Sequence, residues 1–356
     1  MSHLFEPLKV RDVEMPHRIV VSPMCQYSCN DGFATDWHFV HLGSRAVGRA
    51  AAVIAEATAV TADGRISPQD LGLWTDAHIE PLRRTFSFIA EQGSVPGIQL
   101  AHAGRKASTN QPWNGGKPIS PAEGGWTPIF APSALPFAEG YQVPHSLSVD
   151  EIATIVIAFA AAARRAEAAG AKLIELHAAH GYLLHSFLSP ISNQRTDQYG
   201  GSFANRTRMA CEVVNAVRKV WPEKYPLWIR ISATDWVEGG WSVEESVELA
   251  RMLKPMGVDL FDCSSGGNVF NAKIPVGPGY QTAFAEKVRR EAGVLTGAVG
   301  MITDPAQADQ IIRSGQADVA ILARQFLREP YWPLLAARAL GQEIKWPVQY
   351  ERAKLK

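Results

Sequence analysis

The chain is poor in cysteine and carries no excess of charge of either sign. Its 356 residues include four cysteines, Cys25, Cys29, Cys211 and Cys263, which form neither paired CxxC motifs nor a disulfide framework. Thirty-five Lys and Arg residues balance 35 Asp and Glu residues, so electrostatics gives no argument for binding nucleic acid or an anionic membrane surface. We therefore expect a reduced, cytoplasmic protein with no nucleic-acid or membrane partner.

Long apolar runs are also missing. None reaches the roughly 18 residues of a membrane span, because charged residues such as Glu56 and Arg164 interrupt them. The first residues lack a basic region followed by an apolar run, so no signal peptide is expected. A Rossmann fold is disfavoured, because no G-x-G-x-x-G motif opens a helix after the first predicted strand.

Eight short apolar runs are present and predict β-strands. Most are continuous rather than alternating, which is typical of parallel strands covered on both faces. They are Arg18–Ser22, Ala52–Glu56, Val95–Leu100, Lys172–His177, Leu227–Ser232, Leu260–Cys263, Val294–Ala298 and Val319–Ala323.

Helical patterns separate these runs. Ser148 with Glu151, and Ser242 with Glu245, read as capping boxes at two helix starts. Eight β-then-α units without a break in composition predict one domain over residues 1–356, a (β/α)8 TIM barrel with a long loop after its third strand. The helices are expected at Asp36–Arg49, Asp76–Gln92, Ser148–Ala169, Phe203–Val220, Ser242–Met256, Tyr280–Ala292, Asp304–Ser314 and Tyr331–Leu340.

The C-terminal ends of barrel strands face the active site. His177 and His180 follow the fourth strand in an HxxH pattern that could ligate a metal, but no convincing third ligand is found. Gly300 and Arg324 follow strands seven and eight, where barrels often bind phosphate. Gly300 has no Cβ, so its backbone can approach the anion closely, and the guanidinium of Arg324 can donate two hydrogen bonds to it. Three readings remain open: an organic-cofactor enzyme, a metal-dependent hydrolase and a non-catalytic ligand-binding barrel.

Four segments carry a resemblance that covers essentially the whole chain. The sequence resembles the old yellow enzyme family, in particular its bacterial thermophilic-like class of NADPH dehydrogenases and xenobiotic reductases. The segments are Ser22–Tyr27, Gln99–Lys106, His177–Tyr182, and Phe187–Ser202 with Asn205 and Arg206.

The resemblance implies an ene-reductase with non-covalent FMN and with NADPH or NADH as reductant. Its substrates would be α,β-unsaturated carbonyls, maleimides or nitro compounds, whose activated C=C bonds are reduced by two-step (ping-pong) hydride transfer. No metal is expected. The residues implied around the flavin ring are Ser22, Pro23, Met24, Cys25, Ala57, Gln99 and Arg230, and those implied at the phosphate are Gly300, Ala323 and Arg324.

The substrate residues are implied in the same way. His177 and His180 would bind the substrate oxygen, Tyr182 would donate the proton and Tyr27 would line the pocket. The tail, about residues 341–356, resembles one that reaches a neighbouring subunit in a homodimer or homotetramer, where Arg352 would enter the site. A solvated tail is the alternative. The chain has Val299 where some relatives have Trp, and Ala323 where some have Gly, which leaves its substrate range open.

Overall fold

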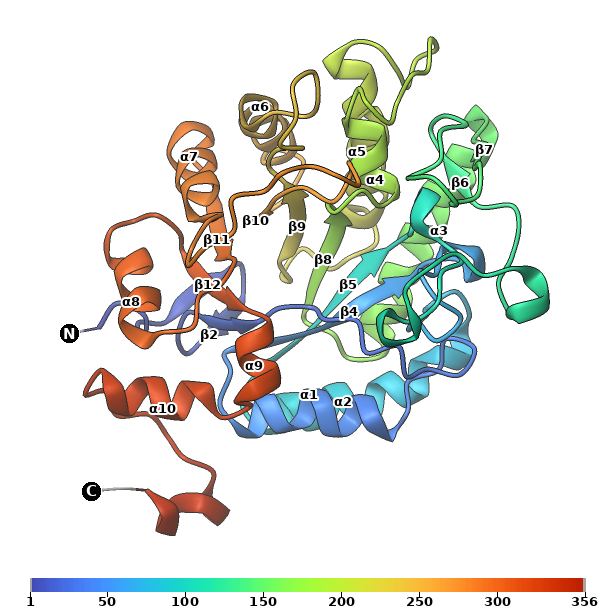
Figure 1. The fold of residues 1–356 in the computed structure, drawn as a ribbon. Coiled ribbons are helices and arrows are strands. Elements are labelled where there is room, and N and C mark those ends of the chain that lie inside the picture. Colours follow the sequence, from blue (N-terminus) through green and yellow to red (C-terminus); the bar gives the residue numbers. More distant parts are fainter. Residues whose placement is uncertain (1, 355–356) are drawn as a thin grey trace.

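A computed structural model of the chain describes residues 2–354 and contains a closed barrel of eight parallel strands (Figure 1). The predicted fold is confirmed, and the strand ends lie within one residue of the predicted ones except at β4, which runs further. Each strand pairs with the next, and β12 pairs with β3 to close the barrel. The strands are β3 (Ile19–Val21), β4 (Ala52–Ala59), β5 (Val95–Ala101), β8 (Leu173–Ala178), β9 (Leu227–Ser232), β10 (Leu260–Ser264), β11 (Leu295–Val299) and β12 (Val319–Leu322).

Helices surround the barrel where the periodic patterns predict them (Figure 1). Both capping boxes form: Ser148 Oγ accepts a hydrogen bond from the Glu151 backbone, and Ser242 Oγ accepts one from Glu245. The helices are α1 (Asp36–Val47), α2 (Ile79–Glu91), α3 (Val149–Ala168), α5 (Phe203–Arg218), α6 (Val243–Leu253), α7 (Thr282–Ala292), α8 (Pro305–Arg313) and α10 (Trp332–Ala339).

Several short elements are absent from the sequence prediction, because two to six residues are too few to show a period. Two helices sit directly after barrel strands, α4 (Leu183–Leu188) and α9 (Arg324–Arg328). An N-terminal hairpin consists of β1 (Leu8–Val10) and β2 (Val13–Met15). The long loop after β5 contains β6 (Phe130–Ala131), which pairs with β7 (His145–Ser146).

Alternation along the strands divides the barrel interior into layers. Side chains two residues apart point to the same face of a strand. Trp228 and Arg230 on β9, and Leu260 and Asp262 on β10, therefore stack above one another. Trp228 and Leu260 belong to a buried apolar cluster. The layer that contains Arg230 and Asp262, called the polar layer below, therefore lies above apolar side chains that fill the barrel. The barrel members of that cluster are Val20, Ala52, Ile54, Val95, Leu173, Trp228, Leu260, Val319 and Ile321.

A β-bulge interrupts β4 beside the polar layer. The register with β5 shifts between Ala55 and Ala57, so Glu56 has no partner in the ladder. Bulges re-aim side chains near active sites. The strand continues past the bulge to Ala59, beyond the predicted end at Glu56.

Candidate active site

A cavity of about 350 Å³ opens at the C-terminal ends of the strands. Three arginines line it: Arg230 on β9, and Arg324 and Arg328 on α9. Ser264 and Val299 also contribute to its wall. The cavity brings together seven residues that the sequence analysis assigned to cofactor or substrate: Ser22, Pro23, His180, Arg230, Gly300, Ala323 and Arg324.

Arg230, which lines this cavity, belongs to the polar layer and is held there rigidly. Its Nε donates to Asp262 Oδ2 at 2.8 Å, and its Nη2 donates to Ser22 Oγ at 2.9 Å. Glu175 Oε1 lies 3.4 Å from Nε and accepts a hydrogen bond from Gln99 Nε2 at 2.7 Å. Two carboxyl groups fix the orientation of this buried guanidinium, so its positive charge has a fixed position in the site.

The sequence analysis gave no role to Glu175 or Asp262. Both are fully buried, and acidic side chains are almost never fully buried without a partner. Each lies two residues after an apolar side chain that points into the barrel, on β8 and on β10. This alternation could have revealed them in the sequence.

His177, His180 and Tyr182 form an aromatic cluster at the C-terminal end of β8. The ring centroid of His177 lies 5.2 Å from that of His180 and 4.9 Å from that of Tyr182. Burial lowers the pKa of both histidines well below the usual value for a histidine. It raises the pKa of Tyr182 well above the usual value for a tyrosine. The cluster therefore holds two neutral imidazoles and a protonated phenol at neutral pH.

Hydrogen bonds orient the two imidazoles. His177 Nδ1 accepts the Ala179 N–H at 3.3 Å, which assigns the proton of the neutral ring to Nε2. His180 Nε2 lies 2.7 Å from Ser264 Oγ, and the His180 backbone N–H donates to Ser232 Oγ. His177 thus offers an N–H donor, whereas the Nε2 atom of His180 is engaged by the protein.

The turn that carries these side chains is strained and tightly packed. His180 has a φ of 59° and Gly181 a φ of 74°, the left-handed region that costs most residues energy. A Cβ at Gly181 would lie 2.3 Å from the Gly267 oxygen. Lys106 Nζ donates to the carbonyls of His180 at 2.9 Å and Gly267 at 3.1 Å. The lysine therefore ties the turn to the loop after β10.

A second buried network holds the same turn from α4. The Gly181 N–H donates to His185 Nδ1 at 2.9 Å, and His185 Nε2 lies 3.2 Å from Asp235 Oδ1. Burial alone would raise the pKa of Asp235. The contact with His185 and the hydrogen bonds from Ser189 and Trp241 outweigh that effect and lower the pKa to about 2.

The loop after β3 carries Cys25 and Tyr27. Burial raises the pKa of the Cys25 thiol and of the Tyr27 phenol, so both are protonated at neutral pH. Tyr27 has a φ of 47° and meets Trp113 edge to face, with ring centroids 5.8 Å apart. The Gln26 N–H donates to Glu56 Oε1 at 3.0 Å. The bulged residue of β4 therefore anchors this loop, a role that the sequence analysis missed.

Arg352 is not brought to the cavity by its own chain. It lies in a 3₁₀ helix, Val348–Ala353, in which no residue is buried. Figure 1 shows this segment beyond α10, apart from the barrel strands. Its predicted place in a neighbouring site stays a prediction.

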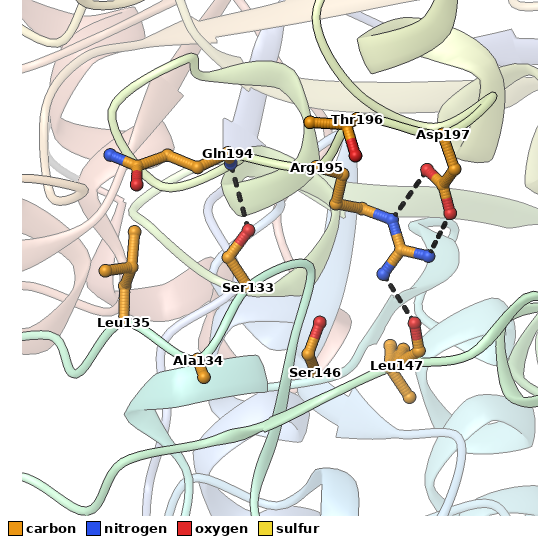
Figure 2. A pocket seen from close by; sticks show the side chains of 9 residues that line it. All are labelled: Ser133, Ala134, Leu135, Ser146, Leu147, Gln194, Arg195, Thr196 and Asp197. Carbon is orange, nitrogen blue, oxygen red and sulfur yellow. Dashed lines mark hydrogen bonds and ion pairs between the residues drawn. The ribbon is translucent and has the colours of Figure 1, made fainter.

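A larger cavity, of about 540 Å³, lies between the β6–β7 loop and the segment after α4 (Figure 2). Its charged residues satisfy each other: Arg195 pairs with Asp197 and donates to the Pro132 and Leu147 carbonyls. The Gln194 N–H donates to Ser133 Oγ. None of the predicted site residues lines it, and its arginine is used to connect two segments of the fold.

Two features are absent from residues 2–354. No group of three or more His, Cys, Asp or Glu side chains is placed there to hold a metal ion. Within the same residues, no helix has the length and apolar character needed to span a membrane.

Comparison with known proteins decides the family. The model of the NADH:flavin oxidoreductase / NADH oxidase family matches residues 3–343. The chain belongs to this family. The match confirms the predicted oxidoreductase activity and FMN cofactor.

Relatives and solved structures agree with the family match. The chain is 49% identical over 351 residues to an NADPH dehydrogenase of Geobacillus sp. (strain WCH70), and 47% identical over 351 residues to one of Bacillus subtilis (strain 168). Each alignment covers 98% of both chains. Morphinone reductase is 27% identical, with a TM-score of 0.79 over 97% of this chain and 91% of its own. The predicted resemblance to old yellow enzymes is thereby confirmed.

Proposed function

We propose that this member of the family uses NADPH or NADH to reduce activated C=C bonds of α,β-unsaturated carbonyls, maleimides or nitro compounds in a ping-pong reaction. One observation carries the proposal: the ring of His177 contacts the ring of Tyr182, and its Nδ1 accepts the Ala179 N–H. The proton of the neutral imidazole is therefore on Nε2, beside a protonated phenol. A neutral N–H donor beside an O–H acid suits a substrate that gains negative charge on oxygen and a proton on carbon. The names of the NADPH dehydrogenase relatives support the choice of reductant.

The cavity has the donors that FMN needs. Gly300, Ala323 and Arg324 would hold the phosphate near the ends of β11 and β12, with Arg328 adding positive charge. Arg230 would face the electron-rich edge of the flavin ring, where a fixed cation stabilises negative charge. The other residues proposed to surround the ring are Ser22, Pro23, Met24, Cys25, Ala57 and Gln99.

The chemistry supplied by bound FMN is hydride transfer, from NAD(P)H in one half-reaction and to the activated double bond in the other. His177 and His180 bind the substrate oxygen, and His177 Nε2–H stabilises the charge that develops there. Ser264 fixes the orientation of the His180 ring. Both rings act as neutral groups because burial lowers their pKa values.

Tyr182 supplies the proton. Burial keeps its phenol protonated, so the O–H is available as a general acid for the α-carbon. Lys106 and His185 hold the turn before it through His180 and Gly181. Tyr27 lines the substrate side, next to Cys25.

The C-terminal tail is proposed to complete the site of a neighbouring subunit in a homodimer or homotetramer. Val348 and Tyr350 in this segment are exposed, which favours a partner surface over bulk water. Arg352 would then approach the neighbouring substrate pocket as a cation. The reaction needs no membrane or nucleic acid, and we propose that it takes place in the cytoplasm.

The test is steady-state turnover of the purified holoprotein with enones, maleimides and nitroalkenes under NADPH and NADH. We expect oxidation of the reduced protein by an enone to yield the saturated carbonyl. A protein that NADPH reduces but that no activated alkene reoxidises would overturn the proposal.

A further inference from the structure

Two carboxyl groups share one guanidinium in the polar layer of the barrel. Asp262 accepts the 2.8 Å hydrogen bond from Arg230 Nε, and Glu175 Oε1 lies 3.4 Å from the same nitrogen. Gln99 Nε2 donates to Glu175 Oε1, and Ser22 Oγ accepts from Arg230 Nη2. All five side chains are buried. With both carboxyl groups ionised, the cluster of one cation and two anions would carry a formal charge of −1 out of contact with water.

One oxygen on each carboxyl group has no donor among the described residues. They are Glu175 Oε2 and Asp262 Oδ1, and the two carboxyl groups are within hydrogen-bonding contact of each other. An ionised carboxylate only accepts hydrogen bonds, and two of them in contact repel. A single proton shared by the two carboxyl groups removes this repulsion and brings the formal charge of the cluster to zero.

We propose that Glu175 and Asp262 share one proton at neutral pH, and that this proton sets the charge that the Arg230 cluster presents to the cofactor above it. The two residues act as a titrating pair rather than as two independent carboxylates. They are positioning residues, because they act on the cofactor through Arg230.

The carboxyl groups of Glu175 and Asp262 are the groups that titrate in this layer, because their neighbours other than Arg230 are uncharged. Burial raises the pKa of Glu175 to about 8, an effect that Arg230 opposes and Asp262 reinforces, and burial also raises the pKa of Asp262. Gln99 on β5 is uncharged. His177, His180 and Cys25 face Arg230 from β8 and from the loop after β3, and all three are neutral.

The redox consequence rests on the proposed function, in which Arg230 lies beside the flavin. Negative charge gained there on reduction attracts the shared proton and raises the pKa of the pair. The midpoint potential of bound FMN should therefore show an additional inflection with pH. The Glu175→Gln variant, whose amide can donate to Asp262 without titrating, should lack this inflection.

Infrared spectroscopy of the oxidised holoprotein tests the shared proton directly. We expect a carboxylic-acid C=O band at neutral pH that shifts in D₂O and disappears in alkali. Labelling glutamate or aspartate carboxyl carbons with ¹³C should move the band, and this identification needs no substitution, so it holds even if Glu175→Gln fails to fold. Burial also raises the pKa of Asp70, so the test is the loss of one acid band in Glu175→Gln. That band should be retained in Glu248→Gln, a control for an exposed glutamate paired with Arg251.

The outcomes separate the inference from the proposed function. No acid band at neutral pH, or a band that neither label moves, overturns the shared proton while leaving the turnover of enones unaffected. A band without the additional inflection in the potential supports the shared proton, and it contradicts the proposed place of Arg230 beside the flavin.

Discussion

The ring of His177 meets the ring of Tyr182 edge to face, with centroids 4.9 Å apart and planes at 79°. Aromatic pairs prefer this geometry, and here it places a neutral N–H donor and a protonated O–H on the same side of the barrel mouth. The contact is local in sequence, but the left-handed residues His180 and Gly181 between the two rings make it possible.

Replacing Tyr182 with Phe should slow the oxidation of the reduced protein by an enone by roughly 10²- to 10⁴-fold, the usual contribution of a general acid. Reduction by NADPH should change little, because no proton is delivered to substrate in that half-reaction. Stopped-flow measurement of each half-reaction checks this. Equal slowing of both would contradict the proton-donor role.

Replacing His177 with Ala should cost roughly 2.7–4 kcal/mol of transition-state stabilisation, as for loss of one oxyanion donor. The kcat/KM for an enone should fall accordingly, and phenol binding should weaken. His145→Ala is the matched control, because His145 is exposed, pairs with Glu151 and does not line the cavity. An unchanged kcat/KM for His177→Ala would show that His177 does not bind the substrate oxygen.

Replacing Gly181 with Ala should destabilise the fold more than the same change at Gly239. Both glycines have φ near +70°, but a Cβ at Gly239 meets nothing within 4 Å, whereas one at Gly181 meets the Gly267 oxygen at 2.3 Å. The left-handed backbone should cost roughly 1–2 kcal/mol at either site, and the clash adds to that at Gly181. Urea unfolding of both variants measures the difference, and equal losses would mean that the turn relaxes.

Replacing Asp235 with Asn should destabilise the protein in a pH-dependent way. The pKa of Asp235 falls from 3.8 to about 2 on folding, so its contribution is complete above about pH 4 and is lost as the pH falls towards 2. The shift corresponds to about 2 kcal/mol. Urea unfolding between about pH 7 and pH 3 measures the free energy of unfolding. The difference in this free energy between wild type and variant should narrow as the pH falls. A constant gap would contradict the assignment.

Replacing Arg352 with Ala should raise the KM for substrate in the intact oligomer while leaving flavin reduction unchanged. Mixing this variant with His177→Ala protomers should restore some activity if the tail enters the neighbouring site, because one hybrid site then has both residues. Sedimentation first establishes the oligomer. Unaltered kinetics in an intact oligomer would place Arg352 in solvent.

Much of the site could be predicted because strand ends are visible in the sequence. His177, His180 and Arg230 follow or lie within apolar runs, and the (β/α)8 order alone places them at one mouth. Alternation along β10 could have placed Asp262 inside the barrel. The roles of Asp262 and Glu56 could not be predicted, because they depend on partners from another strand or loop, Arg230 and Gln26. The short helices α4 and α9 were missed because local periodicity cannot show one or two turns.

The sequence by itself determined the barrel, the order of its strands and which polar side chains reach its mouth, because the apolar runs, caps and turns are local. Only the tertiary structure decided how those side chains are charged. Burial makes the histidines neutral and keeps Tyr182 protonated, and the meeting of β8, β9 and β10 places two carboxyl groups against one guanidinium. Desolvation and contacts between distant strands arise only when the barrel closes.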